Sequence, residues 1–138
     1  MTKKSIIFMI LKYDSNNIFA KIIRGEIPAN KVYEDEKVLA FYDISKAAPI
    51  HVLVIPKGEY INFSDFTKKA KSEEIADFFK KVTLVAALLK ANESDENSGF
   101  RLITNNGANA HQTVPHFHAH ILAGKKLGPL LSFDNELR

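Results

Sequence analysis

The sequence predicts an α+β domain built on an antiparallel β-sheet. Short apolar runs, such as 38–42 and 51–56, are bounded by turn signals and are typical of strands. One long segment, 72–91, has the apolar spacing of an amphipathic helix. Short hairpin connections outnumber helical crossovers, which favours antiparallel pairing. A chain of 138 residues is long enough for one domain with a single core.

The composition excludes several classes of protein. Cysteine is absent, so disulfides and thiolate metal sites are excluded, and a reducing compartment is compatible. The net charge is +3, and lysines alternate with acidic residues instead of forming the basic stripe of a nucleic-acid groove. No apolar run approaches the length of about 18 residues that a membrane span needs. We therefore expect a cytoplasmic protein with no nucleic-acid or membrane partner, and a small anionic ligand is compatible.

Three segments are expected along the chain. Residues 1–14 form an N-terminal extension, residues 15–124 the domain, and residues 125–138 a C-terminal tail. The apolar run 6–11 follows two lysines like a signal peptide, but it is short and no small-residue cleavage site follows. There are no internal repeats and no low-complexity linker.

The first half of the domain is expected to contain a short helix and three strands. Residues 15–17 offer a helix start, and Gly25 ends the helix. Segments 32–34 and 38–42 flank a charged turn and predict a hairpin, and the β-branched run HVLVIP predicts a buried strand. The apolar positions of the helix are Ile18, Phe19, Ile22 and Ile23.

The second half is organised around the long helix at 72–91. Ser72 is expected to cap it, and two glutamates favour its positive end. A loop at 92–99 leads to a strand at 100–105, and an Asn- and Gly-rich loop leads to a last strand at 116–122. The buried stripe of the helix is expected to be Ile75, Phe78, Phe79, Val82, Val85, Ala86 and Leu89.

Four of the 5 histidines lie in the segment HQTVPHFHAH, residues 111–120, and the other is His51. Because side chains alternate along a strand, His116, His118 and His120 are expected on one face, where polar residues would normally meet solvent. Three imidazoles on one face indicate a functional site. The other face would enter the core through Phe117, Ala119 and Ile121.

Two kinds of chemistry fit this pattern. Zinc needs ligand nitrogens at about 2.0–2.1 Å, whereas alternate residues of a strand are about 6.7 Å apart. Two neighbouring imidazoles with His51 from an adjacent strand keep a metal site open as the second interpretation. The first interpretation is chemistry on phosphate, in which a neutral imidazole is the nucleophile and its neighbours carry protons. Backbone N–H groups of the preceding loop would hold the developing charge without a metal.

The segment HQTVPHFHAHIL resembles the HxHxH signature of the histidine-triad (HIT) superfamily. His120 at the third position, instead of glutamine, is similar to the nucleotide-binding (HINT) branch. Segments 18–57 and 101–107 are similar to other motifs of the family in the same order, so the resemblance covers 18–124. It implies a HIT-like fold whose sheet extends across a homodimer, and no cofactor.

The resemblance also implies catalytic roles. His118 would be the nucleophile that takes the nucleotidyl group. His116, His120 and His51 would support it. Thr113 stands where the family has a serine, and its hydroxyl preserves the role.

The ligand contacts are carried over in the same way. Asp43 would accept hydrogen bonds from the ribose hydroxyls. Without the family resemblance, the preferred interpretation of Asp43 is a residue that caps a turn. The phosphate would be held by Asn105, Gln112, Thr113, His118 and His120. The apolar pocket around the base would be Ile18, Phe19, Ile22, Ile27 and Phe41, which are also compatible with plain core packing.

The function implied is that of a purine nucleotide-binding hydrolase, a nucleoside phosphoramidase or nucleotidyl hydrolase. It would act at the α-phosphate of phosphoramidate or acyl derivatives through a covalent nucleotidyl-histidine and release AMP or GMP, without a metal. A nucleotide-binding regulatory protein with residual turnover and a zinc-binding protein stay open as alternatives.

Two features depart from the family pattern. Many bacterial relatives bind structural zinc through a cysteine pair in the first helix, and Asn17 and Ala20 occupy those positions here. The tail 125–138 lacks the tryptophan of better-known HINT proteins. Since that end shapes the substrate entrance in the family, the leaving-group preference is open.

Overall fold

The computed structural model describes residues 12–91 and 98–131. Most of the predicted extension, the loop residues 92–97 and the end of the predicted tail lie outside these ranges. No helix in the described part of the chain is long and apolar enough to cross a membrane.

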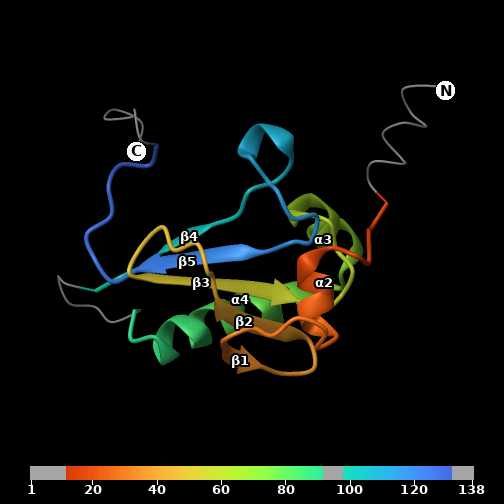
Figure 1. Ribbon diagram of the computed structural model, residues 1–138, viewed down its shortest axis with the longest axis horizontal. Coiled ribbons are helices and arrows are strands. Elements are labelled where there is room, and N and C mark those ends of the chain that lie inside the picture. The colour runs from red at the N-terminus through yellow and green to blue at the C-terminus, as the bar shows by residue number, and fades with distance from the viewer. Residues whose placement is uncertain (1–11, 92–97, 132–138) are drawn as a thin grey trace.

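Within the described residues, strands pair into one antiparallel sheet in the order β1-β2-β3-β5-β4 (Figure 1). The predicted α+β class is therefore confirmed, and the hairpin and the buried HVLVIP strand are present. The strands are β1 (Lys31–Glu34), β2 (Val38–Tyr42), β3 (Ile50–Pro56), β4 (Arg101–Ile103) and β5 (Ala119–Ala123).

Three α-helices are present in the described part: α2 (Ile18–Ile23), α3 (Phe63–Lys69) and α4 (Ser72–Leu88). A 3-10 turn follows β4 at Ala108–Ala110. Helix α3 was not predicted, because this helix of seven residues has only two apolar positions, Phe63 and Phe66, which are too few to show a helical period, and only Phe66 is buried.

The predicted cap and end of the long helix were wrong. Ser72 is already helical, and the N-cap is Lys71, whose side chain makes no capping hydrogen bond. Only two extended residues separate α3 from α4, so the chain turns before it reaches Ser72. At the other end, Lys90 adopts a left-handed φ of 57°, which stops the helix at Leu88 instead of residue 91.

The sheet separates two cores, because alternate residues of its strands point to opposite faces. One face packs against α4, which Figure 1 shows behind the sheet, and against Phe66 of α3. Phe66, Phe78 and Phe117 meet there with ring centroids 4.8 to 5.3 Å apart. Each buried phenyl ring contributes roughly 1.5–3 kcal/mol to folding. The opposite face packs Phe19 and Ile22 of α2 against Leu39, Phe41, Leu53 and Ile55.

The histidine segment differs from the predicted strand. Pairing of β5 begins only at Ala119, because the N–H of Phe117 donates to the carbonyl of Tyr60 instead of to a strand partner. Phe117, Ala119 and Ile121 enter the core as predicted. The expectation of solvent-facing imidazoles was wrong, since His116 is fully buried.

Asp35 ties the β1–β2 turn to α4. Its Oδ1 accepts the N–H groups of Lys37 and Val38, both at 2.8 Å. Its Oδ2 accepts the Tyr33 hydroxyl at 2.8 Å and faces Nζ of Lys81 at 3.1 Å. Burial by itself raises the pKa of Asp35, but these hydrogen bonds outweigh it and hold the pKa well below its usual range.

We expect Asp35→Asn to lower the free energy of unfolding by about 1–3 kcal/mol at neutral pH, because several donors, most of them partly buried, lose an ionised acceptor. The folded-state pKa of Asp35 is depressed, so its stabilisation is complete above the unfolded value of 3.8 and is lost as the pH falls below it. Urea denaturation at pH 7 and pH 3 measures both effects. Asp77→Asn is the matched control, since that half-exposed carboxylate bonds only Lys81 and its loss should cost under about 1 kcal/mol. An equal loss in both variants at pH 7 would contradict the role given to Asp35.

Candidate active site

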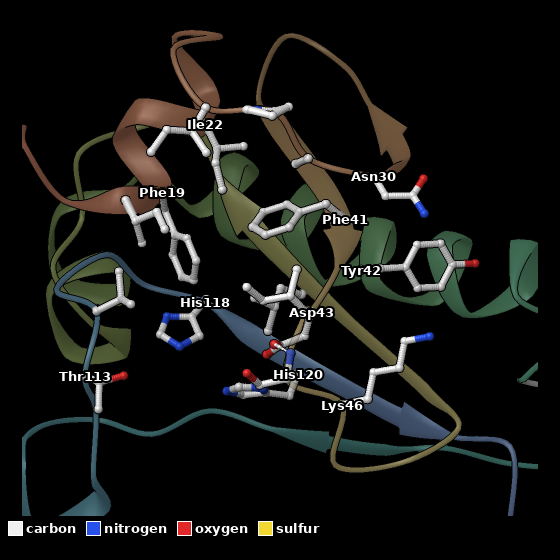
Figure 2. Close-up of a pocket in the computed structure, with 18 residues that line it drawn as sticks. Phe19, Ile22, Asn30, Phe41, Tyr42, Asp43, Lys46, Thr113, His118 and His120 are labelled. Carbon is white, nitrogen blue, oxygen red and sulfur yellow. Dashed lines mark hydrogen bonds between the residues drawn. The ribbon is translucent and has the colours of Figure 1, made fainter.

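A pocket of about 950 Å³ opens on the face of the sheet that carries α2 (Figure 2). Its polar side is lined by Asp43, Thr113, His118 and His120. Its apolar side contains all the residues predicted to surround a base, Ile18, Phe19, Ile22, Ile27 and Phe41. Segments far apart in the sequence therefore meet around one cavity of the size that small ligands occupy.

Helix α2 forms the wall of the pocket and is fixed by its N-cap. Oδ1 of Asn17 accepts the N–H of Ala20 at 2.9 Å, and its Nδ2 donates to the carbonyl of Asp14 at 2.7 Å. Asn17 and Ala20 are the two positions at which many bacterial relatives have the cysteine pair. The cap directs Phe19 inward, where its ring packs edge-on against His118 with centroids 4.9 Å apart.

The protonation pattern of His118 follows from one hydrogen bond. Its Nδ1 lies 2.7 Å from the backbone carbonyl of His116. Because a carbonyl oxygen can only accept, Nδ1 carries the proton. Nε2 is then the unprotonated nitrogen, and it makes no hydrogen bond to the described residues. Burial lowers the pKa of His118, so the ring is neutral at neutral pH. A neutral imidazole with a fixed free lone pair is equipped for nucleophilic attack.

His116 lies behind the pocket, outside its lining. Its Nε2 donates to the carbonyl of Pro56 at 2.7 Å, and its Nδ1 lies 2.7 Å from the hydroxyl of Tyr13. Burial lowers the pKa of His116 to about 4. Both of its nitrogens are thus occupied within the protein, and the side chain supports the site instead of contacting a ligand.

His51 and His120 form a second hydrogen-bonded pair across β3 and β5. The N–H of Ala47 donates to Nδ1 of His51 at 3.0 Å, so the proton of His51 is on Nε2. That proton is donated to Nδ1 of His120 at 2.9 Å, with Oδ2 of Asp43 3.4 Å away. The proton of His120 is consequently on Nε2, which is buried without a partner among the described residues. A buried donor without an acceptor indicates a ligand position.

The electrostatics of the protein favour neutral imidazole rings in the pocket. Burial lowers the pKa of His120 to about 4, and the neighbouring His118 and His51 add to this effect. Burial also lowers the pKa of His51, against the opposing charge of Asp43. An anion bound beside these rings would favour their protonated forms.

The same atoms are the only part of the described chain that groups three ligands of the kinds metals prefer. Asp43, His51 and His120 each offer one ligand atom, and these atoms lie within 4.8 Å of one another. Two imidazoles and a carboxylate fit zinc or a related ion. A metal there would compete with the proton between His51 and His120.

The structure places the remaining predicted residues outside the pocket lining. His51 lies behind His120. Gln112 braces its own loop, because its Oε1 accepts the N–H of Gly107 and its Nε2 donates to the carbonyls of Ile61 and Val114. Asn105 lies in the segment after β4, where it is half-buried.

Sequence reasoning missed several residues of the site. Leu53 could have been found, because strand alternation puts it on the same face as His51. Thr104 had no sequence signal, and its hydroxyl donates to the carbonyl of His118 at 2.8 Å. Tyr13 was assigned to the extension. The other unpredicted lining residues are Pro28, Ala29, Asn30, Tyr42, Ile44, Ser45, Lys46 and Val114.

The fold and the site together define a class of protein in which histidines on an antiparallel sheet line one side of a pocket. The family model for the HIT domain matches residues 24–127. The chain therefore belongs to the HIT family, as its histidine signature predicted.

Known relatives and structures agree with this assignment. An uncharacterised HIT-like protein of Azospirillum brasilense is 48% identical over 124 residues, covering 90% of this chain and 98% of that protein. The purine nucleoside phosphoramidase of Escherichia coli K12 is 42% identical over 115 residues, covering 83% and 92%. The structure of a HIT family hydrolase from Clostridium thermocellum superposes with a TM-score of 0.73 at 42% identity, covering 86% and 99%.

We expect acid to destabilise the folded chain through its buried histidines. The pKa of His120 is about 4 in the folded state against an ordinary 6.5, so the unfolded chain binds a proton that the folded chain does not. The stability of the neutral ring is therefore complete above pH 6.5 and is lost toward pH 4, by at most about 1.4 kcal/mol per pH unit. Urea denaturation between pH 7 and 4 should show a shallower decline in His120→Gln than in the wild type. His111→Asn, at an exposed histidine with a left-handed φ of 61°, should leave the slope unchanged. A wild-type slope in His120→Gln would mean that His120 is not held neutral.

Proposed function

We propose that the chain is a purine nucleotide-binding hydrolase that cleaves nucleoside phosphoramidates at the α-phosphate. The observation that carries the proposal is the fixed tautomer of His118, which leaves Nε2 unprotonated beside an apolar pocket with a carboxylate and a buried donor. The phosphoramidase activity named for the Escherichia coli relative supports the same reaction class.

In the proposed complex, the purine lies among Ile18, Phe19, Ile22, Ile27 and Phe41. The ribose hydroxyls donate to Asp43. The phosphate sits beside Thr113, His118 and His120, with the unpartnered Nε2–H of His120 directed at one of its oxygens or at the leaving nitrogen. Gln112 shapes this end of the pocket from behind, and Asn105 lies in the adjoining segment.

The first step forms a bond from Nε2 of His118 to phosphorus and breaks the bond from phosphorus to the leaving nitrogen. The phosphate charge raises the pKa of the His51–His120 pair on binding, so the complex takes up one proton, with Asp43 as counter-charge. The Nε2–H of His120 passes to the leaving nitrogen, which departs as a neutral amine. The nucleotidyl group is then held on His118 as a covalent intermediate.

The second step returns the site to its starting state. Water attacks phosphorus and gives its proton to the His51–His120 pair, while the bond between His118 and phosphorus breaks. The nucleoside monophosphate, AMP or GMP, is released and His118 recovers its free Nε2. One proton is taken up and one is returned, so the cycle leaves the protonation state of the site unchanged.

We infer that the chain forms a homodimer, as the family resemblance implies, and that it acts in the cytoplasm. β4 lies at an edge of the sheet, and its residue Leu102 is 42% exposed. An exposed strand edge with an apolar side chain is suited to pairing with a second copy.

Zinc binding is the second candidate, favoured by the Asp43, His51 and His120 cluster. This candidate treats the same atoms as metal ligands instead of as a proton-bearing pair. A resident metal would occupy the nitrogen of His120 that accepts the His51 proton, and turnover would then depend on the metal.

Replacing the nucleophile tests the proposal. We expect His118→Ala to lower turnover of a fluorogenic adenosine phosphoramidate by roughly 10³-fold or more, because attack on phosphorus is lost. Wild-type turnover should persist in EDTA, and mass spectrometry after quenching in alkaline denaturant should find a nucleotidyl adduct on His118, because the phosphorus–nitrogen bond of the adduct is labile in acid. The matched control is His111→Asn, which changes an exposed histidine of the same segment and should keep full turnover.

Each other outcome has a meaning. Turnover that survives in His118→Ala would sink the mechanism. AMP binding without wild-type turnover would point to a regulatory nucleotide-binding protein. Stoichiometric zinc in the purified chain, with turnover lost in EDTA, would favour the metal site.

The proton donor predicts a dependence on the leaving group. We expect His120→Gln to lower kcat/KM by roughly 10²–10⁴-fold for an alkylamine phosphoramidate, whose nitrogen cannot leave unprotonated. For an activated aryl ester of AMP, which leaves without a proton, the loss should be much smaller. Steady-state kinetics on both substrates measure the ratio, and an equal loss on the two would rule out His120 as the donor.

A further inference from the structure

The hydroxyl of Tyr13 lies 2.7 Å from Nδ1 of His116, and the two rings meet edge-on with centroids 5.7 Å apart. His116 is fully buried, whereas Tyr13 is half-buried. Tyr13 precedes the residues that match the HIT domain and lies 103 positions before its partner in the chain. A residue from outside the domain signature therefore contacts the first histidine of the triad.

The direction of this hydrogen bond is fixed by the rest of the network. Nε2 of His116 faces the carbonyl of Pro56 and must donate to it, so in the neutral ring Nδ1 is an acceptor. Burial raises the pKa of Tyr13, which keeps its hydroxyl protonated and able to donate. Tyr13 thus satisfies the one nitrogen of His116 that would otherwise be a buried acceptor without a partner.

His116 is joined to the nucleophile through its main chain. Its carbonyl oxygen accepts the Nδ1–H of His118, and its own N–H donates to the carbonyl of Val114 at 2.9 Å. The segment pairs with β3 only from Ala119 onward. The peptide group that carries the His116 carbonyl is held on its N–H side, because the N–H of Phe117 donates to the carbonyl of Tyr60 at 2.7 Å. The remaining freedom of the carbonyl is limited by the two anchors of the His116 side chain, Pro56 and Tyr13.

We propose that Tyr13 is a positioning residue that acts through the ring of His116 to hold the carbonyl that orients His118 and fixes its tautomer. Without the hydroxyl, the ring of His116 keeps only the Pro56 anchor and can rotate about it. The His116 carbonyl then moves relative to Nδ1 of His118, and Nε2 is aimed at phosphorus for a smaller fraction of the time. The inference rests on the proposed function, because it gives His118 the role of nucleophile.

A purely structural role for Tyr13 makes a different prediction. Removing a hydroxyl from a half-buried hydrogen bond would lower stability and leave the reaction unchanged. Tyr33 provides the matched comparison, since its hydroxyl donates to Oδ2 of Asp35 at 2.8 Å on the opposite side of the sheet from the pocket. Tyr13→Phe and Tyr33→Phe thus remove the same group from similar bonds.

The experiment compares both variants with the wild type. We expect Tyr13→Phe to lower kcat for the adenosine phosphoramidate by about tenfold with KM changed less than about twofold. The reason is that Nε2 of His118 is oriented toward phosphorus for a smaller fraction of the time, whereas the residues that line the pocket are unchanged. Tyr33→Phe should keep the wild-type kcat. Long-range ¹H–¹⁵N spectra of the imidazoles should show His118 with Nδ1 protonated in the wild type and in Tyr33→Phe, and a mixture of tautomers in Tyr13→Phe.

The two readouts separate the inference from the proposed function. A kcat for Tyr13→Phe equal to that of Tyr33→Phe, with an unchanged His118 tautomer, would overturn the role of Tyr13. If the wild type does not turn over the phosphoramidate, the proposed function fails, and the tautomer of His118 in Tyr13→Phe still decides whether Tyr13 controls its orientation.

Discussion

The site depends on one hydrogen bond, from Nδ1 of His118 to the backbone carbonyl of His116. Since the acceptor is a carbonyl, this bond admits a single tautomer and leaves Nε2 unprotonated. The carbonyl in turn is held because the ring of His116 is buried and bonded at both nitrogens. The chemistry of an exposed pocket thus follows from a residue that no ligand reaches.

Removing four imidazoles from water costs free energy, and their hydrogen bonds offset this cost more fully for some rings than for others. Desolvation lowers the pKa of His51, His116, His118 and His120 and favours the neutral form of each ring. A neutral buried ring needs one donor and one acceptor partner, and His116 and His51 have both. His120 lacks an acceptor for Nε2. Unsatisfied polar groups persist in folded proteins where function requires them. The unpartnered Nε2–H of His120 therefore lowers the stability of the fold at the point where a bound ligand would supply an acceptor.

Much of the fold could be predicted because local pattern determines it. The alternation of Phe117, Ala119 and Ile121 follows from strand geometry whatever surrounds the strand, and it predicted the core correctly. The late start of β5, the burial of His116 and the presence of α3 depend on contacts with distant segments. The apolar lining of the pocket followed from the family resemblance. The contact of Tyr13 with His116 could not be predicted, because 103 residues separate the pair and a lone tyrosine has no periodic signal.

The register of the sheet is part of the chemistry. Leu53 pairs with His120 and His51 pairs with Leu122, so the two imidazoles are diagonal neighbours on one face of adjacent strands. A slip of one residue would turn His51 to the opposite face, into the core packed by α4, and break its bond to His120. The apolar pairs that oppose such a slip, among them Val52 with Ile121, lie on that opposite face and are fully buried. The core on the face packed by α4 thereby helps to align the His51–His120 pair on the opposite face of the sheet.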